Sequence, residues 1–314
     1  MAQLYIGGKP YGPHPFVCQI RDMKTHEPLE GVHVGDIGPK FGYNTMDNGF
    51  LLFNRKPLKL PDDDIVLRSK LYLLVQTWLT CGSFLDVQIP HVNMLARFSS
   101  VDPESSKYIR PSSPSLIYGT LTWVRSTIVL QSGGVLARGV TIATRYAAVR
   151  RQFQDRDAPS DAHGENQVLN YTMVQFRLLP LLAATFALHF TGKAMMALYQ
   201  ENQKRMQSDA GKVSDLNRGA GPEETHSGSD LLADLHATSC GLKALGSTTA
   251  AEGLEVCRRA CGGHGYSSFS GIGSWYADYL PTTTWEGDNY MLTQQVARYV
   301  RILPTLEVTV LTVA

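Results

Sequence analysis

The sequence predicts an α+β fold in which an incomplete β-domain is followed by an antiparallel four-helix bundle. Two observations support this. Before about residue 112 the chain has short β-type apolar runs separated by Gly- and Pro-containing turns, and after it long stretches carry apolar residues at helical spacing. Long helices joined by short loops pack as antiparallel neighbours. We therefore expect four regions: a partial β-domain over 1–63, a linker over 64–112, a helical domain over 113–302 and an atypical tail over 303–314.

The first region contains the expected strands, which lie at residues 4–6, 16–20, 32–34 and 50–53. Turn signals separate them, among them Gly7–Pro10 and Asp47–Gly49. Four strands form only half a sandwich or an unclosed barrel, and their edges need a cover. Because no later segment is rich in strands, we expect this β-domain to be incomplete.

The helical region contains four segments with apolar residues at helical spacing: residues 115–153, 167–206, 229–260 and 284–302. Three polar or Gly-rich stretches are expected to be loops: residues 154–166, 211–228 and 261–274. Pro180 predicts a kink in the second helix, because its ring removes one backbone hydrogen bond. Ser227 or Ser229 is a plausible cap for the third helix.

Two segments conflict with this arrangement. Residues 64–92 contain the apolar run Leu71–Thr80 with no partner element, and residues 303–314 form a Val/Thr-rich, strand-like end to a helical domain. Natural sequences usually avoid such conflicts between local and global structure. We therefore interpret 64–92 as a suspected insertion, an untranslated stretch read through, and expect a frame or splice error after about residue 302. Peptides from Leu71–His91 in native extracts would contradict this interpretation.

Composition excludes several classes of protein. The net charge of +1 over 314 residues provides no basic field for nucleic acid. Five scattered cysteines without a CxxC pair indicate a reducing compartment and argue against a disulfide framework or a structural zinc. The longest apolar run, Leu71–Thr80, is about half the length of a membrane span. We therefore expect a soluble intracellular protein with no membrane span and no metal.

Glu286 lies in the run TWEGDN (284–289), at the start of the expected fourth helix. In one interpretation Thr283 and Glu286 form a capping box, each bonding to the backbone N–H of the other. In the other, Glu286 is a general base whose pKa rises between an aromatic residue and a glycine in a partly dry pocket. Spacing alone does not separate the two interpretations.

Two further motifs allow both a structural and a functional interpretation. The glycines of CGGHGY (261–266) could let the backbone cradle a phosphate, or Gly262 could simply end a helix. His264 with Cys257 and Cys261 makes a poor metal site, because no carboxylate or second histidine lies at ligand spacing. Arg150 and its neighbour Arg151 could offset a helix dipole or hold a pyrophosphate through forked guanidinium contacts.

In their order and spacing these motifs resemble the flavin-dependent acyl-coenzyme A oxidases, relatives of the acyl-coenzyme A dehydrogenases. The segments that carry the resemblance are GDIGPKFG (35–42), MDNG (46–49), YGT (118–120), ATRY (143–146) with Val149 and Arg150, CGGHGY (261–266) and WEGDN (285–289). The resemblance covers about residues 2–63 and 93–302. CGGHGY and EGDN favour the oxidase over the dehydrogenase, and the fold implied is acyl-CoA dehydrogenase-like.

The resemblance implies an enzyme that binds FAD and oxidises a fatty acyl-CoA to the trans-2-enoyl-CoA. Molecular oxygen is the electron acceptor and becomes H2O2, in the first step of peroxisomal β-oxidation. Glu286 matches the catalytic base of the family. Arg150 and Phe153 match positions that contact the flavin cofactor, with Arg150 at its pyrophosphate. Gly263 lies on a loop that reaches the cofactor from the neighbouring subunit, which implies a homodimer.

Departures from the family pattern keep two alternatives open. The N-terminal helical domain of the family, the first half of its β-domain, the C-terminal helical domain of the oxidases and a peroxisomal tripeptide are all expected to be missing. One alternative is a dehydrogenase that passes electrons to a protein acceptor. The other is a catalytically inactive helical-bundle fragment.

Overall fold

The computed structural model describes residues 2–53, 73–74, 86–87, 93–96, 99–102, 105–110, 119–154, 157, 159, 164–216 and 227–302. The chain divides into two compact units: Met1–Pro39 with Thr45–Gly119, and Lys40–Asn44 with Thr120–Ala314. The suspected insertion at 64–92 lies outside the described residues except for 73–74 and 86–87, and the atypical tail at 303–314 lies wholly outside them.

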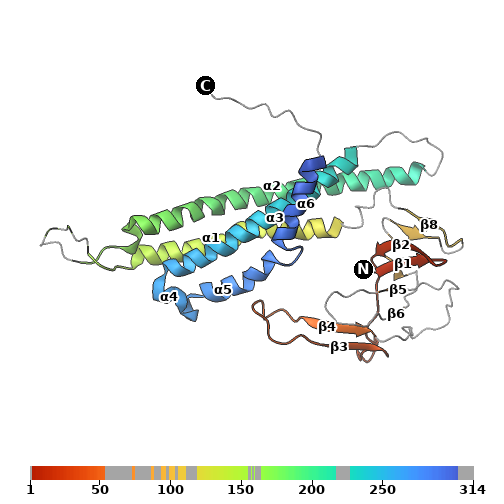
Figure 1. Cartoon of the computed structure of the whole chain (residues 1–314), viewed down its shortest axis with the longest axis horizontal. Coiled ribbons are helices and arrows are strands. Elements are labelled where there is room, and N and C mark those ends of the chain that lie inside the picture. The colour runs from red at the N-terminus through yellow and green to blue at the C-terminus, as the bar shows by residue number, and fades with distance from the viewer. Residues whose placement is uncertain are drawn as a thin grey trace, which may run out of the picture. The chain divides into compact units, whose positions relative to one another are not determined.

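The first unit is built from antiparallel two-stranded ladders (Figure 1). They pair β1 (Ala2–Ile6) with β2 (Lys9–His14), β3 (Val32–Asp36) with β4 (Gly49–Phe53), β5 (Leu73–Leu74) with β6 (Asp86–Val87), and β7 (Ser100–Val101) with β8 (Tyr108–Ile109). In the ladder of β3 and β4, Val32 lies opposite Phe53, and both side chains are buried.

Two strand predictions in this unit are wrong. β2 begins at Lys9, inside the segment that the sequence assigned to a turn, because the chain reverses tightly at Gly7 and Gly8, both at positive φ. Residues 16–20 form no strand and make only an isolated bridge from Phe16 to Met94. The apolar alternation of 16–20 has another cause, since Phe16, Cys18 and Ile20 pack against the cluster around Val32 and Phe53.

The second unit contains three long helices that lie side by side, with shorter helices against them (Figure 1). The long helices are α1 (Gly119–Val149), α2 (Thr172–Leu216) and α3 (Ser227–Ala260). The shorter ones are α4 (Gly262–Tyr266), α5 (Ile272–Tyr279) and α6 (Asn289–Ile302), with 3-10 turns at Val168–Asn170, Ser268–Ser270 and Leu280–Thr283. α2 continues without interruption through Pro180.

Two glycines allow α1 and α2 to touch backbone to backbone. A Cβ atom on Gly133 of α1 would lie 2.7 Å from the backbone N of His189 on α2. Conversely, a Cβ atom on Gly192 of α2 would lie 2.5 Å from the Cα of Leu130 on α1. Any larger residue at either position would force the two helices apart.

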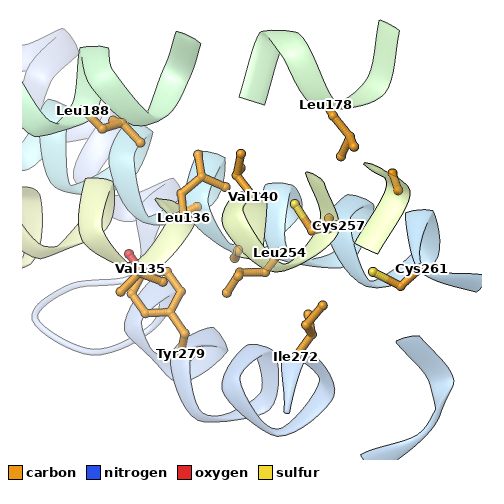
Figure 2. Close-up of a cluster of buried hydrophobic side chains, with 14 residues drawn as sticks. Val135, Leu136, Val140, Leu178, Leu188, Leu254, Cys257, Cys261, Ile272 and Tyr279 are labelled. Atoms are coloured by element: carbon orange, nitrogen blue, oxygen red, sulfur yellow. The ribbon is translucent and has the colours of Figure 1, made fainter. Parts of the chain in front are cut away.

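The main core of this unit lies where α1, α2, α3 and α5 meet, and Figure 2 shows their side chains converging there. The labelled members are Val135, Leu136, Val140, Leu178, Leu188, Leu254, Cys257, Cys261, Ile272 and Tyr279. α5 corrects a prediction, because its first residues fall in the stretch 261–274 that the sequence assigned to a loop. Its apolar residues recur at helical spacing over Ile272–Tyr279, a signal that Gly271 and Gly273 obscured.

The outer face of α2 is strongly apolar. Six large side chains that are 41–70% exposed lie along it: Met173, Phe176, Leu179, Leu182, Phe186 and Phe190. By length and composition alone, the part of α2 over Thr172–Arg205 is also long and apolar enough to cross a membrane, and 17% of its apolar 18-residue stretch is buried. The expectation of no membrane span therefore stays a prediction. An exposed apolar stripe of this kind marks a surface for further contacts.

Candidate active site

The conformation of the loop that carries Glu286 excludes a capping box. α6 begins at Asn289 rather than at 284, and Glu286 lies in a turn with φ 58°, followed by Gly287 with φ 106°. Two successive residues at positive φ cannot belong to a right-handed helix. The hydroxyl of Thr283 instead donates to the carbonyl of Leu280. The capping interpretation of Glu286 is therefore wrong.

Two buried cations from different helices hold this loop by its backbone. Arg125 of α1 donates through Nε to the carbonyl oxygen of Glu286 at 2.9 Å. Lys243 of α3 donates through Nζ to the carbonyl oxygen of Gly287 at 2.8 Å. Arg125 is 7% exposed and Lys243 is 0% exposed. Sequence reasoning missed both residues, although a cation on an otherwise buried helix face is a signal that could have revealed them.

Asn289 completes the attachment of the loop to α3. Its Oδ1 accepts a second hydrogen bond from Lys243 Nζ at 2.9 Å. Its Nδ2 lies 2.9 Å from the hydroxyl oxygens of both Ser247 and Thr248 and 3.2 Å from the carbonyl oxygen of Ala244. The first residue of α6 is thus bound to α3 through both ends of its side-chain amide.

Burial sets the electrostatics of this region. Desolvation, followed by the nearby Arg125, lowers the pKa of Lys243 to about 8, and Asp288 and Glu286 oppose this shift. Burial also raises the pKa of the Cys240 thiol, which lies 3.4 Å from Nη1 of Arg125. In this dry environment Arg125 thus disfavours the charge of Lys243.

One oxygen of the Glu286 carboxylate, Oε2, is buried in a residue that is half-buried as a whole. It has no hydrogen-bond partner among the described residues. The adjacent Trp285 ring makes an edge contact with the Tyr43 ring, with centroids 5.4 Å apart. The Tyr43 backbone N–H donates to Asp278 Oδ1 at 2.7 Å, which seats this segment on α5. A buried acceptor without a donor costs free energy, and a catalytic role is one explanation for such a group in a folded protein.

Arg150 and Phe153 lie in the segment that leaves α1. The carbonyl of Arg150 accepts from the Val168 N–H at 2.8 Å, and the carbonyl of Phe153 accepts from the Asn166 N–H at 2.7 Å. Phe153 has φ 62°, and its side chain is 69% exposed. Pairing with residues 166–168 therefore gives a defined shape to a stretch that presents Arg150 and Phe153 on the surface.

Gly263 belongs to α4, which lies at the same end of the unit as the last turn of α1 (Figure 1). His264 Nδ1 lies 3.0 Å from the hydroxyl of Tyr146, which brings α4 to the last turn of α1. Gly262 follows the end of α3 with φ 57°, as expected of a glycine that ends a helix. Apart from its chain neighbours and the backbone of its own helix, no atom of the described residues lies within 4 Å of the position that a Cβ on Gly263 would occupy. The glycine stretch is therefore a short helix with an open surface, rather than the predicted loop.

The structure does not bring the four predicted site residues together. Glu286 is held by Arg125 near the start of α1, whereas Gly263 and Arg150 lie near its end. At 1.5 Å per residue, the 21 residues from Arg125 to Tyr146 span about 32 Å. The predicted base and the predicted cofactor-binding residues thus occupy opposite ends of one helix.

The described residues contain no group of three or more His, Cys, Asp or Glu side chains arranged to hold a metal ion. Cys257 and Cys261 are both buried, and burial raises the pKa of the Cys257 thiol to about 12. His264 contacts Tyr146 instead of either cysteine.

Comparison with known proteins identifies the family of this chain. A family model described as acyl-CoA oxidase, C-alpha1 domain, matches residues 118–301. Peroxisomal acyl-coenzyme A oxidase 1 of Rattus norvegicus is 38% identical over 299 residues, and the protein of the same name from Arabidopsis thaliana is 39% identical over 305. Each match covers 95% of this chain but only 37% of the relative.

Solved structures agree with these matches. Acyl-CoA oxidase 1 of Arabidopsis thaliana superposes with a TM-score of 0.72 at 38% identity, covering 95% of this chain and 38% of that one. Acyl-CoA oxidase-2 of Caenorhabditis elegans, bound with FAD, ascaroside-CoA and ATP, gives a TM-score of 0.73 at 34% identity, covering 95% and 37%. This chain therefore spans a little over a third of the length of the relatives that it matches.

Proposed function

This chain belongs to the acyl-CoA oxidase family, and from that premise we propose that it carries the catalytic base and part of the cofactor site of a peroxisomal acyl-CoA oxidase. The reaction is the FAD-dependent oxidation of a fatty acyl-CoA to the trans-2-enoyl-CoA, with oxygen reduced to H2O2, the first step of peroxisomal β-oxidation. The observation that carries the proposal is the buried Oε2 atom of Glu286, without a hydrogen-bond partner among the described residues, on a loop whose backbone is held by Arg125 and Lys243.

Glu286 acts as the base. Its carboxylate removes the α-proton of the thioester while the β-hydrogen leaves as hydride, so that a double bond forms between the two carbons. An α-proton is far less acidic than a carboxylic acid, so the step also requires preorganised donors to the thioester oxygen. The Oε2 atom, which has no donor among the described residues, is available to take the proton.

The far end of α1 suits a flavin cofactor. Arg150 is exposed there, and a guanidinium fork matches a pyrophosphate. The open surface at Gly263 lets a ligand approach the backbone, and Phe153 offers an exposed ring. Arg150, Phe153 and Gly263 would hold FAD, which when bound supplies the hydride acceptor and the route of electrons to oxygen.

We also propose a homodimer. The base and the cofactor-binding residues of one chain are separated by about 32 Å along α1. The two groups of one chain thus lie at opposite ends of a long helix. If each cofactor lies between two copies, the base of one copy and the Arg150 end of the other serve the same reaction.

Glu286→Gln tests the proposal, with Glu252→Gln on the exposed face of α3 as the matched control. The chain is produced with FAD, its bound flavin is measured from visible absorbance, and peroxide is measured under air with an acyl-CoA and no added electron acceptor. We expect a yellow protein in all three forms. Turnover should fall at least about 100-fold in Glu286→Gln, the scale of a general base, and stay within about twofold in Glu252→Gln.

Three outcomes would argue against parts of the proposal. Unchanged turnover in Glu286→Gln would contradict the role of the base. Flavin reduction by acyl-CoA without peroxide would favour the dehydrogenase alternative. A colourless, inactive wild-type protein would favour the inactive bundle.

A further inference from the structure

Lys243 is an unusual residue to find at the centre of a helical bundle. It is fully buried, and in a folded protein a buried ammonium group requires polar partners. Among the described residues its ammonium group donates to the carbonyl oxygen of Gly287 and to Oδ1 of Asn289, both just after Glu286 in sequence. The described contacts of Lys243 therefore connect α3 to the loop of the proposed base.

The loop needs such a connection because of its backbone conformation. Glu286 has φ 58°, which a non-glycine residue adopts only at a cost in free energy. Gly287 follows with φ 106°, and a Cβ at this position would lie 2.7 Å from Leu292 Cδ2. A strained backbone persists only where the surrounding structure holds it.

From the proposed role of Glu286, we propose that Lys243 is a positioning residue that fixes the orientation of the Glu286 side chain through the Gly287 carbonyl and Asn289. Arg125 holds the carbonyl of Glu286 from α1, so two successive carbonyls are held from two helices. Without the Lys243 amine, the peptide unit that follows Gly287 is released, and the strained turn at Glu286 loses one of these two hydrogen bonds. A base displaced by about 1 Å loses on the order of 100-fold in rate.

The position of Lys243 separates this role from general stabilisation. The residues Cys240 and Ala244, on either side of Lys243 in α3, form a buried cluster with Leu292 of α6 that is separate from the main core. The ladder of hydrogen bonds within α3 does not depend on the Lys243 side chain. Removing its amine should therefore loosen the loop before it loosens the bundle.

The test compares Lys243→Met, which keeps the length of the chain but removes the donor, with Lys193→Met on the exposed surface of α2. Amide hydrogen exchange is followed by mass spectrometry over residues 284–292 and over residues 135–143 of α1. In Lys243→Met we expect exchange at least about tenfold faster over 284–292, with residues 135–143 unchanged. Lys193→Met should match wild type in both segments.

A kinetic arm separates this inference from the proposed function. In flavin-loaded protein, Lys243→Met should lower kcat about 10- to 100-fold, with KM for acyl-CoA and the flavin content within about twofold of wild type. If the wild-type chain binds no flavin and produces no peroxide, the proposed function fails, and the exchange arm still decides the role of Lys243.

Two results would overturn the inference. Unchanged exchange over 284–292 would show that the loop keeps its conformation without Lys243. Faster exchange spread equally over both segments would show that Lys243 stabilises the whole bundle. If Lys243→Met does not fold, Lys243→Gln is used in its place. The glutamine side chain is shorter and cannot reach both Gly287 and Asn289. Exchange is then compared over the same two segments.

Discussion

Gly265 and Gly263 lie two residues apart in α4 but in opposite environments, so substituting alanine at each should have opposite effects. A Cβ on Gly265 would overlap the carbonyl oxygen of Arg258, lie 2.8 Å from its carbonyl carbon and lie 3.1 Å from the Cβ of Cys261. Contacts under 3.0 Å essentially do not occur for real Cβ atoms. The obstructing atoms belong to the backbone at the end of α3, so they cannot move aside as a side chain would.

The expected cost of Gly265→Ala follows from this overlap. Overpacking against a fixed neighbour costs about 1–3 kcal/mol, and backbone atoms place this case near the upper end. The higher helix propensity of alanine offsets up to about 1 kcal/mol of this loss of stability. A net loss of about 2 kcal/mol, or about 4–8 °C in Tm for a unit of this size, is expected. Gly263→Ala meets nothing within 4 Å and should be neutral or slightly stabilising.

Urea unfolding followed by far-UV circular dichroism measures both variants under identical conditions. The free energy of unfolding should rank Gly263→Ala at or above wild type and Gly265→Ala clearly below it. If the two variants agree to within about 0.5 kcal/mol, the packing of α4 against the end of α3 is not as described, and the reasoning is refuted.

Two further predictions concern stability. Leu254 is 0% exposed in the main core, so Leu254→Ala should lower the free energy of unfolding by about 3–5 kcal/mol. Leu245 is 61% exposed on the same helix, so Leu245→Ala should lower it by less than about 0.5 kcal/mol. Similar losses of the two variants in urea unfolding would contradict the core assignment. The pKa of Lys243 is lowered from 10.5 to about 8, so between these pH values the unfolded chain keeps a proton that the native protein has lost, and the free energy of unfolding should rise with pH. At 1.36 kcal/mol for each pKa unit, the free energy of unfolding should rise by about 3 kcal/mol. The charged or titratable groups that face Lys243 are Arg125, Asp288, Glu286 and Cys240. An equal rise in Lys243→Met would exclude Lys243 as the cause.

Local patterns in the sequence correctly predicted much of this protein. Hydrophobic periodicity identified the three long helices, because a helix that buries one face repeats its apolar residues every three to four positions. The α+β fold class and the family are confirmed by the relatives and by the solved structures. Short motifs selected Glu286, Arg150, Phe153 and Gly263, whose roles stay predictions.

Local patterns were insufficient where contacts over long sequence separation decide the outcome. The same run around Glu286 fits a capping box or a strained turn, and only the packing of α1 and α3 selects the turn. Arg125 acts on Glu286 across 161 positions and Lys243 acts on Gly287 across 44, so no local pattern links them. The sequence by itself determined the three long helices and the family, because periodicity and short motifs are set by residues near one another in the chain. Only the tertiary structure decided how the Glu286 loop is held and that it lies far from Arg150, because both depend on which helices meet.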